Sequence, residues 1–576
     1  MQMNGGQLVV EMLRAHGVRF VFGVPGDTSL ALYDALHQAQ TRGQLTHVLA
    51  RDERSAAYMA DVYARVSFRP GVTEAPSGAG ATYLAAGLAE PHASSIPVIA
   101  LTSDTPLASK DRNVLTALDQ PALFAPITKW RTLVERADQI PDVLRQAFRV
   151  ATSGRNGAVQ ITLPMDVLAE ESKVSSGTHL YAEAGCASYP AYRTRPDPEA
   201  VEQAADLVTK ASRPAIVAGG GAVISGAWAE LVALAEALGA PVGTSICGKG
   251  AIAEAHPLSM GVVGDNGGRP YANALLRGAD LIFYVGCKTD SVTTDGWKLP
   301  PRTTSQTILH LDVDPTEIGR NYQAAAGLVG DARLGLADLL AAVRARQSQP
   351  RPNPLLPLAG EIAAFWADLE AKAAAETTPI KPQRVIQTLG RLLPEDAIIV
   401  ADAGTPTPFT AAYLQSAAGR HVIIPRGYGG LGYALPGVLG AKLARPGATV
   451  VGLIGDGSFG MSAGELETIA RLGLPLTIIQ FNNGCYGWIK ALQELVHGAQ
   501  SFGVDFGTET DHAAIARGFG LRGVQVDDPR DVEPALREAL ASGVPTFIDI
   551  YTECESTEVP PVARWQRAIG REAGHA

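Results

Sequence analysis

The chain alternates short apolar runs with Ala- and Leu-rich stretches of helical character. The first part contains the apolar runs FVFGV, HVLA and PVIALTSD, separated by the helical stretches ALYDALHQA and RSAAYMADVYARV. The alternation resumes around PAIVAGGG, ADLIFYVG and TILHLDVDP, and again around AIIVADAG, ATVVGLIGDG, LTIIQFNN and PTFIDIYTE. Strands that alternate with helices form parallel sheets covered by helices. We therefore predict an α/β fold of three doubly wound parallel-sheet domains.

Two segments interrupt this alternation and divide the chain. A polar stretch with Gly, Ser and Pro runs from Glu170 to Pro198, and a Pro-rich stretch, QSQPRPNPLLP, begins at Gln347. Such compositions are typical of linkers, and 576 residues exceed what one hydrophobic core usually organises. We predict an N-terminal domain at 1–180, a middle Rossmann-like domain at 190–345, a C-terminal domain at 375–555 and a tail at 556–576.

Composition excludes several classes of protein. A hydrophobic fraction of 46% and a charged fraction of 18% predict compact folding rather than disorder. A formal net charge of -10 argues against nucleic acid as a partner. The five cysteines form no CxxC pair, which argues against a disulfide framework or a zinc site. No apolar run approaches the roughly 18 residues of a membrane span, and Glu11 and Arg14 interrupt any signal-peptide pattern. We expect a cytoplasmic protein without a membrane partner.

The most informative residues follow two neighbouring apolar strands. VVGLI runs into GDG, and LTIIQF runs into NNG. Parallel strands end at the same sheet edge, so Asp456 and Asn483 are expected to meet there. A carboxylate, an amide oxygen and a backbone carbonyl at Cys485 suit Mg²⁺ or Ca²⁺, which would also keep phosphate oxygens as ligands. Gly457 and Ser458 open the following helix and would offer N–H groups to the same phosphates.

GDG followed by NN at the end of the next strand resembles the signature of thiamine-diphosphate enzymes. Nearly the whole chain is similar to the acetolactate synthase, pyruvate decarboxylase and benzaldehyde lyase group. The resemblance implies that the N-terminal domain binds the aminopyrimidine, that the C-terminal domain binds the diphosphate, and that the middle domain can carry another nucleotide. The implied cofactors are thiamine diphosphate and Mg²⁺ or Ca²⁺.

The resemblance also assigns a catalytic glutamate. Activation of the cofactor requires a buried carboxyl group that protonates the far ring nitrogen of the aminopyrimidine. Glu53 follows HVLA, begins an Ala-rich helix, and matches the family pattern R-x-E-x-x-A-x-x-M-A-x-x-Y-A-R. From the residues alone, Glu53 is a charge that favours a helix N-terminus and nothing more. The family pattern makes it the predicted activator.

Further cofactor contacts are implied in two glycine-bearing segments. In GYGGLGYALPGVLGAKLA, Leu431 aligns with the bulky residue that props the two cofactor rings into a V, and Gly429 lets the backbone approach them. The alternative is a core leucine in a glycine-rich bend. Gly404 and Thr405, after AIIVAD, match a region that contacts the diphosphate, although relatives more often carry Gln-His or Asn-His there.

The residues that would surround the substrate give mixed indications. Asp27, in GVPGDTS, stands where decarboxylases carry a catalytic aspartate, and Thr28 beside it is assigned to the substrate pocket. A capped turn is the alternative for Asp27. Gln120, also predicted to be catalytic, stands where decarboxylases use histidines and resembles acetolactate synthases. Trp488 and Ile489 are predicted to line the pocket, and Trp488, in place of the family methionine, would narrow the space for an acceptor.

Two further features bear on the middle domain and on assembly. Lys288, in YVGCKTDSVTT, stands where flavin-binding synthases carry an arginine, which argues against FAD. In the family the counterparts of Glu53 and Asp456 come from different subunits. The resemblance therefore implies at least a homodimer and predicts a homotetramer.

The predicted activity is that of a carboligase or lyase. It would act on a 2-oxo acid or 2-hydroxy ketone through an enamine bound at the cofactor's C2 atom. Alternatives are a decarboxylase that uses Asp27 as proton donor, a diketone hydrolase, and a catalytically silent binding subunit on the same fold. Intact Glu53, Asp456 and Asn483 argue against a silent subunit. The sequence leaves the donor and acceptor open.

Overall fold

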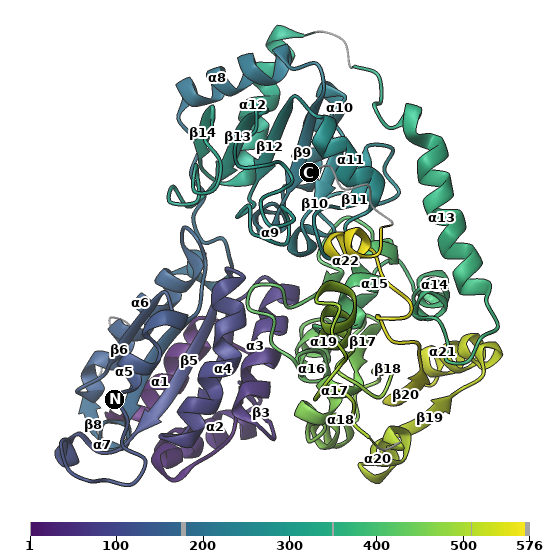
Figure 1. The fold of residues 1–576 in the computed structure, drawn as a ribbon. Coiled ribbons are helices and arrows are strands. Elements are labelled where there is room, and N and C mark those ends of the chain that lie inside the picture. The colour runs from purple at the N-terminus through teal and green to yellow at the C-terminus, as the bar shows by residue number, and fades with distance from the viewer. Residues whose placement is uncertain (1, 174–179, 348–350, 508–509, 571–576) are drawn as a thin grey trace. The chain divides into compact units, whose positions relative to one another are not determined.

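Parallel sheets form the framework of the part of the chain that the structure describes. In the computed structural model, which describes residues 2–173, 180–347, 351–507 and 510–570, there are three parallel sheets of six strands each (Figure 1). The predicted α/β class is confirmed. The chain divides into two compact units. One comprises residues 1–192, 425–447 and 461–474, and the other comprises 193–424, 448–460 and 475–576.

The first unit holds the sheet with strand order β3-β2-β4-β5-β7-β6. Its strands are β2 (Phe20–Gly23), β3 (Thr46–Leu49), β4 (Gly71–Ala75), β5 (Val98–Asp104), β6 (Trp130–Leu133) and β7 (Val159–Pro164). Every residue of β4 and β7 is buried, as expected where helices cover both faces of a parallel sheet. The helices of this unit are α1 (Gly5–Ala15), α2 (Leu30–Thr41), α3 (Glu53–Ser67), α4 (Ala79–Ala93), α5 (Gln120–Leu123), α6 (Ile140–Thr152), α7 (Met165–Ala169), α16 (Ala434–Ala444) and α18 (Glu465–Leu472).

Part of the predicted first linker belongs to a small sheet. Strand β1 (Gln2–Asn4) pairs antiparallel with β8 (Glu171–Lys173), with Met3 opposite Ser172. The start of this segment is therefore ordered by pairing with the N-terminus, which its polar composition did not indicate. Residues 174–179, and residues 348–350 of the second predicted linker, lie outside the described residues.

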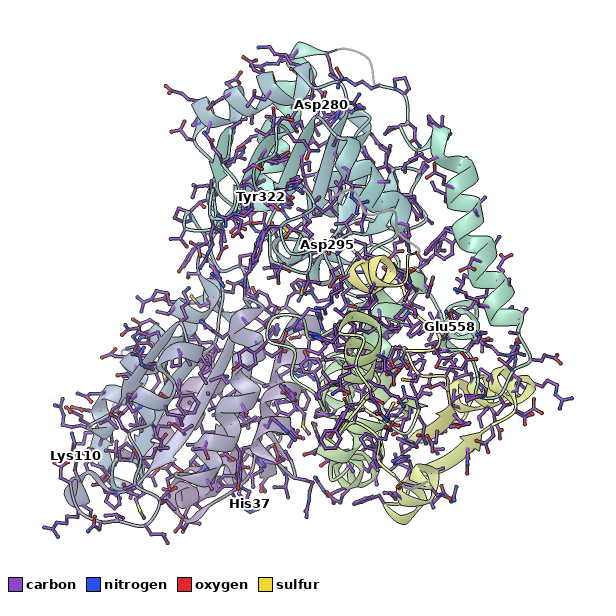
Figure 2. All side chains as sticks on the ribbon, viewed as in Figure 1. His37, Lys110, Asp280, Asp295, Tyr322 and Glu558 are labelled. Carbon is purple, nitrogen blue, oxygen red and sulfur yellow. The ribbon has the colours of Figure 1, made fainter. Side chains whose placement is uncertain are left out.

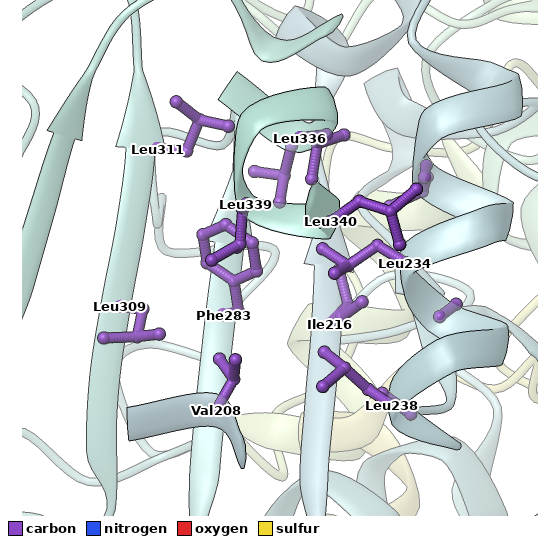
Figure 3. Packing of buried hydrophobic residues seen from close by; sticks show 14 of the residues in the cluster. Val208, Ile216, Leu234, Leu238, Phe283, Leu309, Leu311, Leu336, Leu339 and Leu340 are labelled. Carbon is purple, nitrogen blue, oxygen red and sulfur yellow. The ribbon is translucent and has the colours of Figure 1, made fainter. Parts of the chain in front are cut away.

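The second unit contains the middle sheet, with order β11-β10-β9-β12-β13-β14. Counted along the chain this order is 3-2-1-4-5-6, that of dinucleotide-binding folds, so the Rossmann-like prediction is confirmed as a fold. Phe283, Leu309, Leu311, Leu336 and Leu339 belong to its buried core (Figure 3). The elements are β9 (Pro214–Ala218), β10 (Val242–Thr244), β11 (Ser259–Val262), β12 (Leu281–Val285), β13 (Thr307–Asp312), β14 (Ala326–Val329), α8 (Pro198–Lys210), α9 (Gly220–Ser225), α10 (Trp228–Leu238), α11 (Pro270–Gly278) and α12 (Ala332–Arg346).

The same unit contains the third sheet, with order β16-β15-β17-β18-β20-β19. Counted along the chain, the first and third sheets share the order 2-1-3-4-6-5. The strands are β15 (Ile398–Ala401), β16 (Val422–Ile423), β17 (Val450–Gly455), β18 (Thr477–Asn482), β19 (Arg522–Val526) and β20 (Thr546–Tyr551). The helices are α13 (Ala359–Ala374), α14 (Pro382–Leu392), α15 (Pro406–Tyr413), α17 (Asp456–Ser462), α19 (Gly487–Ala491), α20 (His512–Gly518), α21 (Val532–Ala541) and α22 (Ala563–Ala568).

Residues 556–570 of the predicted C-terminal tail pack against other parts of the second unit. Glu558, labelled in Figure 2, accepts hydrogen bonds from Lys381 (2.7 Å) and Gln383 (2.8 Å). Trp565 of α22 is fully buried, and Arg567 donates to Asp295 at 2.8 Å. These contacts hold the tail on the start of α14 and on the segment between β12 and β13. Among the described residues, no helix has the length and apolar character needed to cross a membrane.

Candidate functional site

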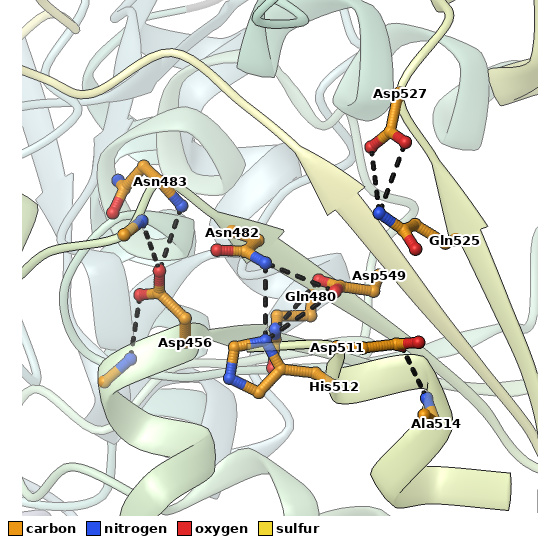
Figure 4. A network of polar contacts seen from close by, with 12 residues as sticks. Asp456, Gln480, Asn482, Asn483, Asp511, His512, Ala514, Gln525, Asp527 and Asp549 are labelled. Atoms are coloured by element: carbon orange, nitrogen blue, oxygen red, sulfur yellow. Dashed lines mark hydrogen bonds and ion pairs between the residues drawn. The ribbon is translucent and has the colours of Figure 1, made fainter. Parts of the chain in front are cut away.

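Two neighbouring strand ends bring Asp456 and Asn483 together. β17 and β18 pair in parallel, and Asp456 and Asn483 each directly follow one of them. One carboxylate oxygen of Asp456 accepts the N–H of Asn483 (3.0 Å) and of Gly484 (2.7 Å), and the other accepts the N–H of Gly457 (2.8 Å; Figure 4). The predicted adjacency of the two strand ends is confirmed.

The Asp456 carboxyl group is nearly out of contact with solvent. The residue is 5% exposed, and burial raises its pKa to about 6, although the three backbone N–H groups oppose that shift. The group therefore holds its proton more tightly than an exposed aspartate does. A cation placed beside it would favour the ionised form.

Asn483 links this strand end to a third one. Its amide nitrogen donates to the Thr405 hydroxyl at 3.4 Å and to Glu555 at 3.2 Å, and its amide oxygen accepts the N–H of Cys485 at 3.3 Å. Thr405 follows β15 and directly precedes α15. The structure therefore gathers four predicted residues, Asp456, Asn483, Cys485 and Thr405, at one edge of the third sheet.

Glu555 lies in this cluster, and the sequence analysis missed it. Its side chain is fully buried, and burial raises its pKa to about 8. One carboxyl oxygen has no hydrogen-bond partner among the described residues. A Cβ atom at Gly487 would collide with the other oxygen, so the glycine makes room for this carboxyl group. The only signal in the sequence is that an acidic segment follows the strand FIDIY.

Two cysteines that are far apart in the sequence meet beside the cluster. The sulfur atoms of Cys485 and Cys554 are 3.5 Å apart, although 69 residues separate them. Neither forms a disulfide. The wide spacing of the cysteines in the sequence did not indicate this pair.

The donor set fits a hard divalent cation together with a diphosphate. Asp456 and Asn483 offer a carboxylate and an amide oxygen, which such cations prefer. Within the described residues, no group of three or more His, Cys, Asp or Glu side chains could hold a metal alone. Remaining ligands would come from backbone and diphosphate oxygens. The predicted diphosphate contacts lie in the same unit. Gly457 has no room for a side chain, because a Cβ there would lie 2.6 Å from the Tyr486 ring, and Gly404 has a φ of +94°, which favours glycine. Ser458 is buried in α17.

Glu53 is the first residue of α3 in the first unit. Asp52 caps this helix by accepting the N–H groups of Arg54 (2.8 Å) and Ser55 (3.2 Å). Glu53 is 8% exposed, and burial, followed by the charge of Asp52, raises its pKa. A Cβ at Gly80 would lie 3.0 Å from a Glu53 oxygen, so the glycine keeps space beside the carboxyl group. These properties suit a group that holds and donates a proton.

Thr28 and Gln120 meet through a third residue. The Thr28 hydroxyl lies 2.8 Å from that of Ser103 and accepts the N–H of Ser77 at 3.2 Å. Gln120 is fully buried and donates to the Ser103 carbonyl at 2.8 Å, while its amide oxygen has no partner among the described residues. Asp27 is exposed at the start of a short 3₁₀ turn, outside this network. Ser77 and Ser103 are further residues that the sequence analysis missed.

Trp488 and Ile489 lie on α19. The Trp488 ring packs on that of Trp565 at 4.4 Å between centroids, and the Arg564 guanidinium lies 5.4 Å from its centre. Ile489 is 46% exposed. Trp488 thus contacts the tail helix α22, which its position after the NN motif did not indicate. Leu431 and Gly429 lie in the first unit, in a loop described below.

Comparison with known proteins identifies the family. Models of thiamine pyrophosphate (thiamine diphosphate) enzymes match in three parts: the N-terminal TPP binding domain at residues 3–123, the central domain at 201–339 and the C-terminal TPP binding domain at 402–550. The chain is 35% identical to the probable acetolactate synthase large subunit of Methanocaldococcus jannaschii, over 98% of this chain and 94% of the relative. It is 34% identical to the acetolactate synthase isozyme 3 large subunit of Escherichia coli, over 93% and 92%. The chain therefore belongs to the thiamine-diphosphate-dependent enzymes of the acetolactate synthase group, and it is a carboligase or lyase of that cofactor class.

Proposed function

We propose that the chain binds thiamine diphosphate through Mg²⁺ held by Asp456, Asn483 and the backbone carbonyl of Cys485. The observation that carries the proposal is the meeting of Asp456 and Asn483 at adjacent ends of β17 and β18. When bound, the cofactor supplies a carbon nucleophile for attack on a carbonyl group. Glu53 would hold the proton that activates the aminopyrimidine, and Gly404, Thr405, Gly457 and Ser458 would contact the diphosphate.

The proposed reaction is carboligation of a small 2-oxo acid or 2-hydroxy ketone to a second carbonyl compound. The names of the relatives, acetolactate synthases, support a ligating activity. The Gln120 amide oxygen, which has no hydrogen-bond partner among the described residues, and the buried Thr28 hydroxyl offer polar contacts for a substrate. No flavin is part of the proposal, because Lys288 replaces the arginine expected for one.

The test is product analysis with the purified protein. It would be incubated with thiamine diphosphate, Mg²⁺ and a panel of 2-oxo acids, alone and with aldehyde or 2-oxo acid acceptors, and products would be identified by mass spectrometry. Ligated hydroxy ketones or hydroxy acids support the proposal. Aldehyde as the sole product from every donor would refute it.

Asp27→Asn should leave ligation within about threefold of wild type, because in a ligase the reacting carbon attacks a carbonyl group and takes no proton from Asp27. Asp27 is exposed and lies outside the network that joins Thr28 and Gln120. If the reaction ended in aldehyde release, the reacting carbon would need a proton and Asp27 would be the donor, so turnover would fall sharply. Rates of ligated and aldehyde product formation for this variant separate the two mechanisms.

Trp488→Ala provides the contrasting variant. It should broaden acceptor choice, because a smaller side chain enlarges the acceptor space. Trp488→Phe keeps an aromatic contact with Trp565 and controls for loss of tail packing. Loss of ligated product in Asp27→Asn, with an unchanged acceptor range in Trp488→Ala, would show that the proposed mechanism is wrong.

We also propose at least a homodimer, with a homotetramer as the expected assembly, in which each site takes Glu53 from one chain and Asp456 from another. The resemblance to the family supports this arrangement.

The absence of disulfides among the five cysteines, all within the described part of the chain, supports a reducing, cytoplasmic location.

Co-expression of differently tagged Glu53→Gln and Asp456→Ala chains should give mixed dimers with about half the wild-type activity, since one of the two symmetric sites then keeps both residues. Each variant alone should be inactive. The measurement is the rate of product formation after purification by both tags. Inactive mixed dimers would mean that one chain supplies both residues of a site.

A further inference from the structure

A buried carboxylate holds the backbone of the loop that carries Leu431. Glu90 lies in the last turn of α4 and is fully buried. One of its oxygens accepts the N–H of Gly427 at 3.0 Å, and the other accepts the N–H groups of Tyr428 (2.7 Å) and Gly429 (3.1 Å). Three successive backbone N–H groups thus converge on one side chain, although they lie 337 to 339 residues away in the sequence.

Two further donors complete the surroundings of this carboxylate. The Ser94 hydroxyl donates to Glu90 at 2.7 Å and the Arg65 guanidinium at 3.3 Å. A carboxylate has about four acceptor positions, so five donors engage it fully. Because the Glu90 carboxylate is buried, movement of the loop away from it would leave its acceptor positions without partners, which is unfavourable.

The loop conformation is one that only small residues permit. Gly429 has a φ of +82°, and a Cβ at Gly427 would collide with Ser94. A Cβ at Gly430 would collide with the Tyr58 hydroxyl on α3. The glycines therefore allow the backbone to reach Glu90 and α3, and Glu90 supplies the attraction that selects this conformation.

The residues after Leu431 are held by the same group of charges. The Tyr433 hydroxyl donates to Asp61 at 2.6 Å. Arg65 donates to Asp61 at 2.9 and 3.1 Å as well as to Glu90, and Asp61 and Glu90 are both fully buried. The Arg65 guanidinium thus links Glu90, which binds the backbone before Leu431, to Asp61, which binds Tyr433 after it.

We propose that Glu90 is a positioning residue that preorganises the Gly427–Gly429 backbone, and with it Leu431, for the cofactor. The inference rests on the proposed role of Leu431 in propping the cofactor rings. Charge-assisted hydrogen bonds to backbone N–H groups are stronger than neutral ones, so the loop is ordered before the cofactor arrives. Without the carboxylate, the cost of ordering the loop would reduce cofactor affinity.

The test is Glu90→Gln. Glutamine keeps the shape but replaces one acceptor oxygen with an N–H₂ group that faces backbone N–H donors. Hydrogen–deuterium exchange of the 427–429 amides in the cofactor-free protein should become about tenfold faster, and the Kd for thiamine diphosphate with Mg²⁺ should rise about tenfold. The rate of cofactor C2–H exchange at saturation should stay within about threefold of wild type, because bound cofactor restores the loop.

Two other variants make the result decisive. Glu317→Gln removes a buried carboxylate that binds Arg320 at 2.9 Å in the second unit, and it should leave loop exchange and the Kd unchanged.

If Glu90→Gln does not fold, Ser94→Ala decides the question, because loss of the 2.7 Å donor should still accelerate exchange at 427–429. Unchanged loop exchange in the folded variant overturns the proposal. A protein that binds no thiamine diphosphate refutes the proposed function instead, and the exchange measurement in cofactor-free protein still reports on the loop.

Discussion

Asp456→Ala should abolish metal-dependent retention of thiamine diphosphate. A hard cation would lose the only carboxylate among its proposed protein ligands, and the backbone of Asn483 and Gly484 would lose the acceptor that holds it. The Kd should rise by more than about 100-fold, the upper end of what loss of an indirect contact to a metal usually costs. Calorimetric titration with thiamine diphosphate and Mg²⁺ measures it.

Two controls accompany this variant. Asp549→Asn changes a buried acid on the neighbouring strand β20, which binds Gln480 at 2.9 Å and Asn482 at 3.2 Å, and it should keep metal-dependent binding. In the wild-type protein, affinity should be constant well above pH 6 and fall about tenfold per pH unit below it, because the Asp456 pKa is raised to about 6 and a proton competes with the cation. Undiminished affinity in Asp456→Ala would contradict the assignment.

Glu53→Gln should bind the cofactor with nearly wild-type affinity but slow exchange of its C2 proton by about 10²- to 10⁴-fold. An amide cannot supply the proton that the aminopyrimidine needs. The substitution preserves volume in the space that Gly80 keeps beside the carboxyl group. Burial raises the pKa of Glu53, so the exchange rate of this variant reports the loss of a group that holds a proton and not the loss of a surface charge. NMR in D₂O after rapid acid quench gives the exchange rate.

The neighbouring acid supplies the control for Glu53. Asp52→Asn alters the helix cap that binds Arg54 and Ser55 but leaves the Glu53 carboxyl group in place. It should change stability slightly, since asparagine also caps helices well. It should slow C2–H exchange far less than Glu53→Gln does, because burial, the larger cause of the raised Glu53 pKa, is retained. Equal slowing in both variants, or a wild-type rate in Glu53→Gln, would remove Glu53 from the role of activator.

Local features of the sequence were enough to predict the fold class and one edge of the site. Short apolar strands alternating with helices imply parallel sheets, and parallel sheets align their strand ends, so Asp456 and Asn483 could be placed together without a structure. The role of Glu53 came from the family resemblance, because its local signal is only that of a charge at a helix N-terminus. The roles of the site residues stay predictions until the variants are measured.

The tertiary structure alone decided the contacts between segments distant in sequence. The pairing of β1 with β8, the buried Glu555 beside Asn483, the approach of Cys485 to Cys554 and the clamp of Glu90 on Gly427–Gly429 have no local pattern. Composition placed residues 171–173 in a linker, and no sequence pattern marked Glu90. Which partners such residues meet depends on how whole helices and sheets pack, and hydrophobic periodicity specifies which face of an element is buried but not against what.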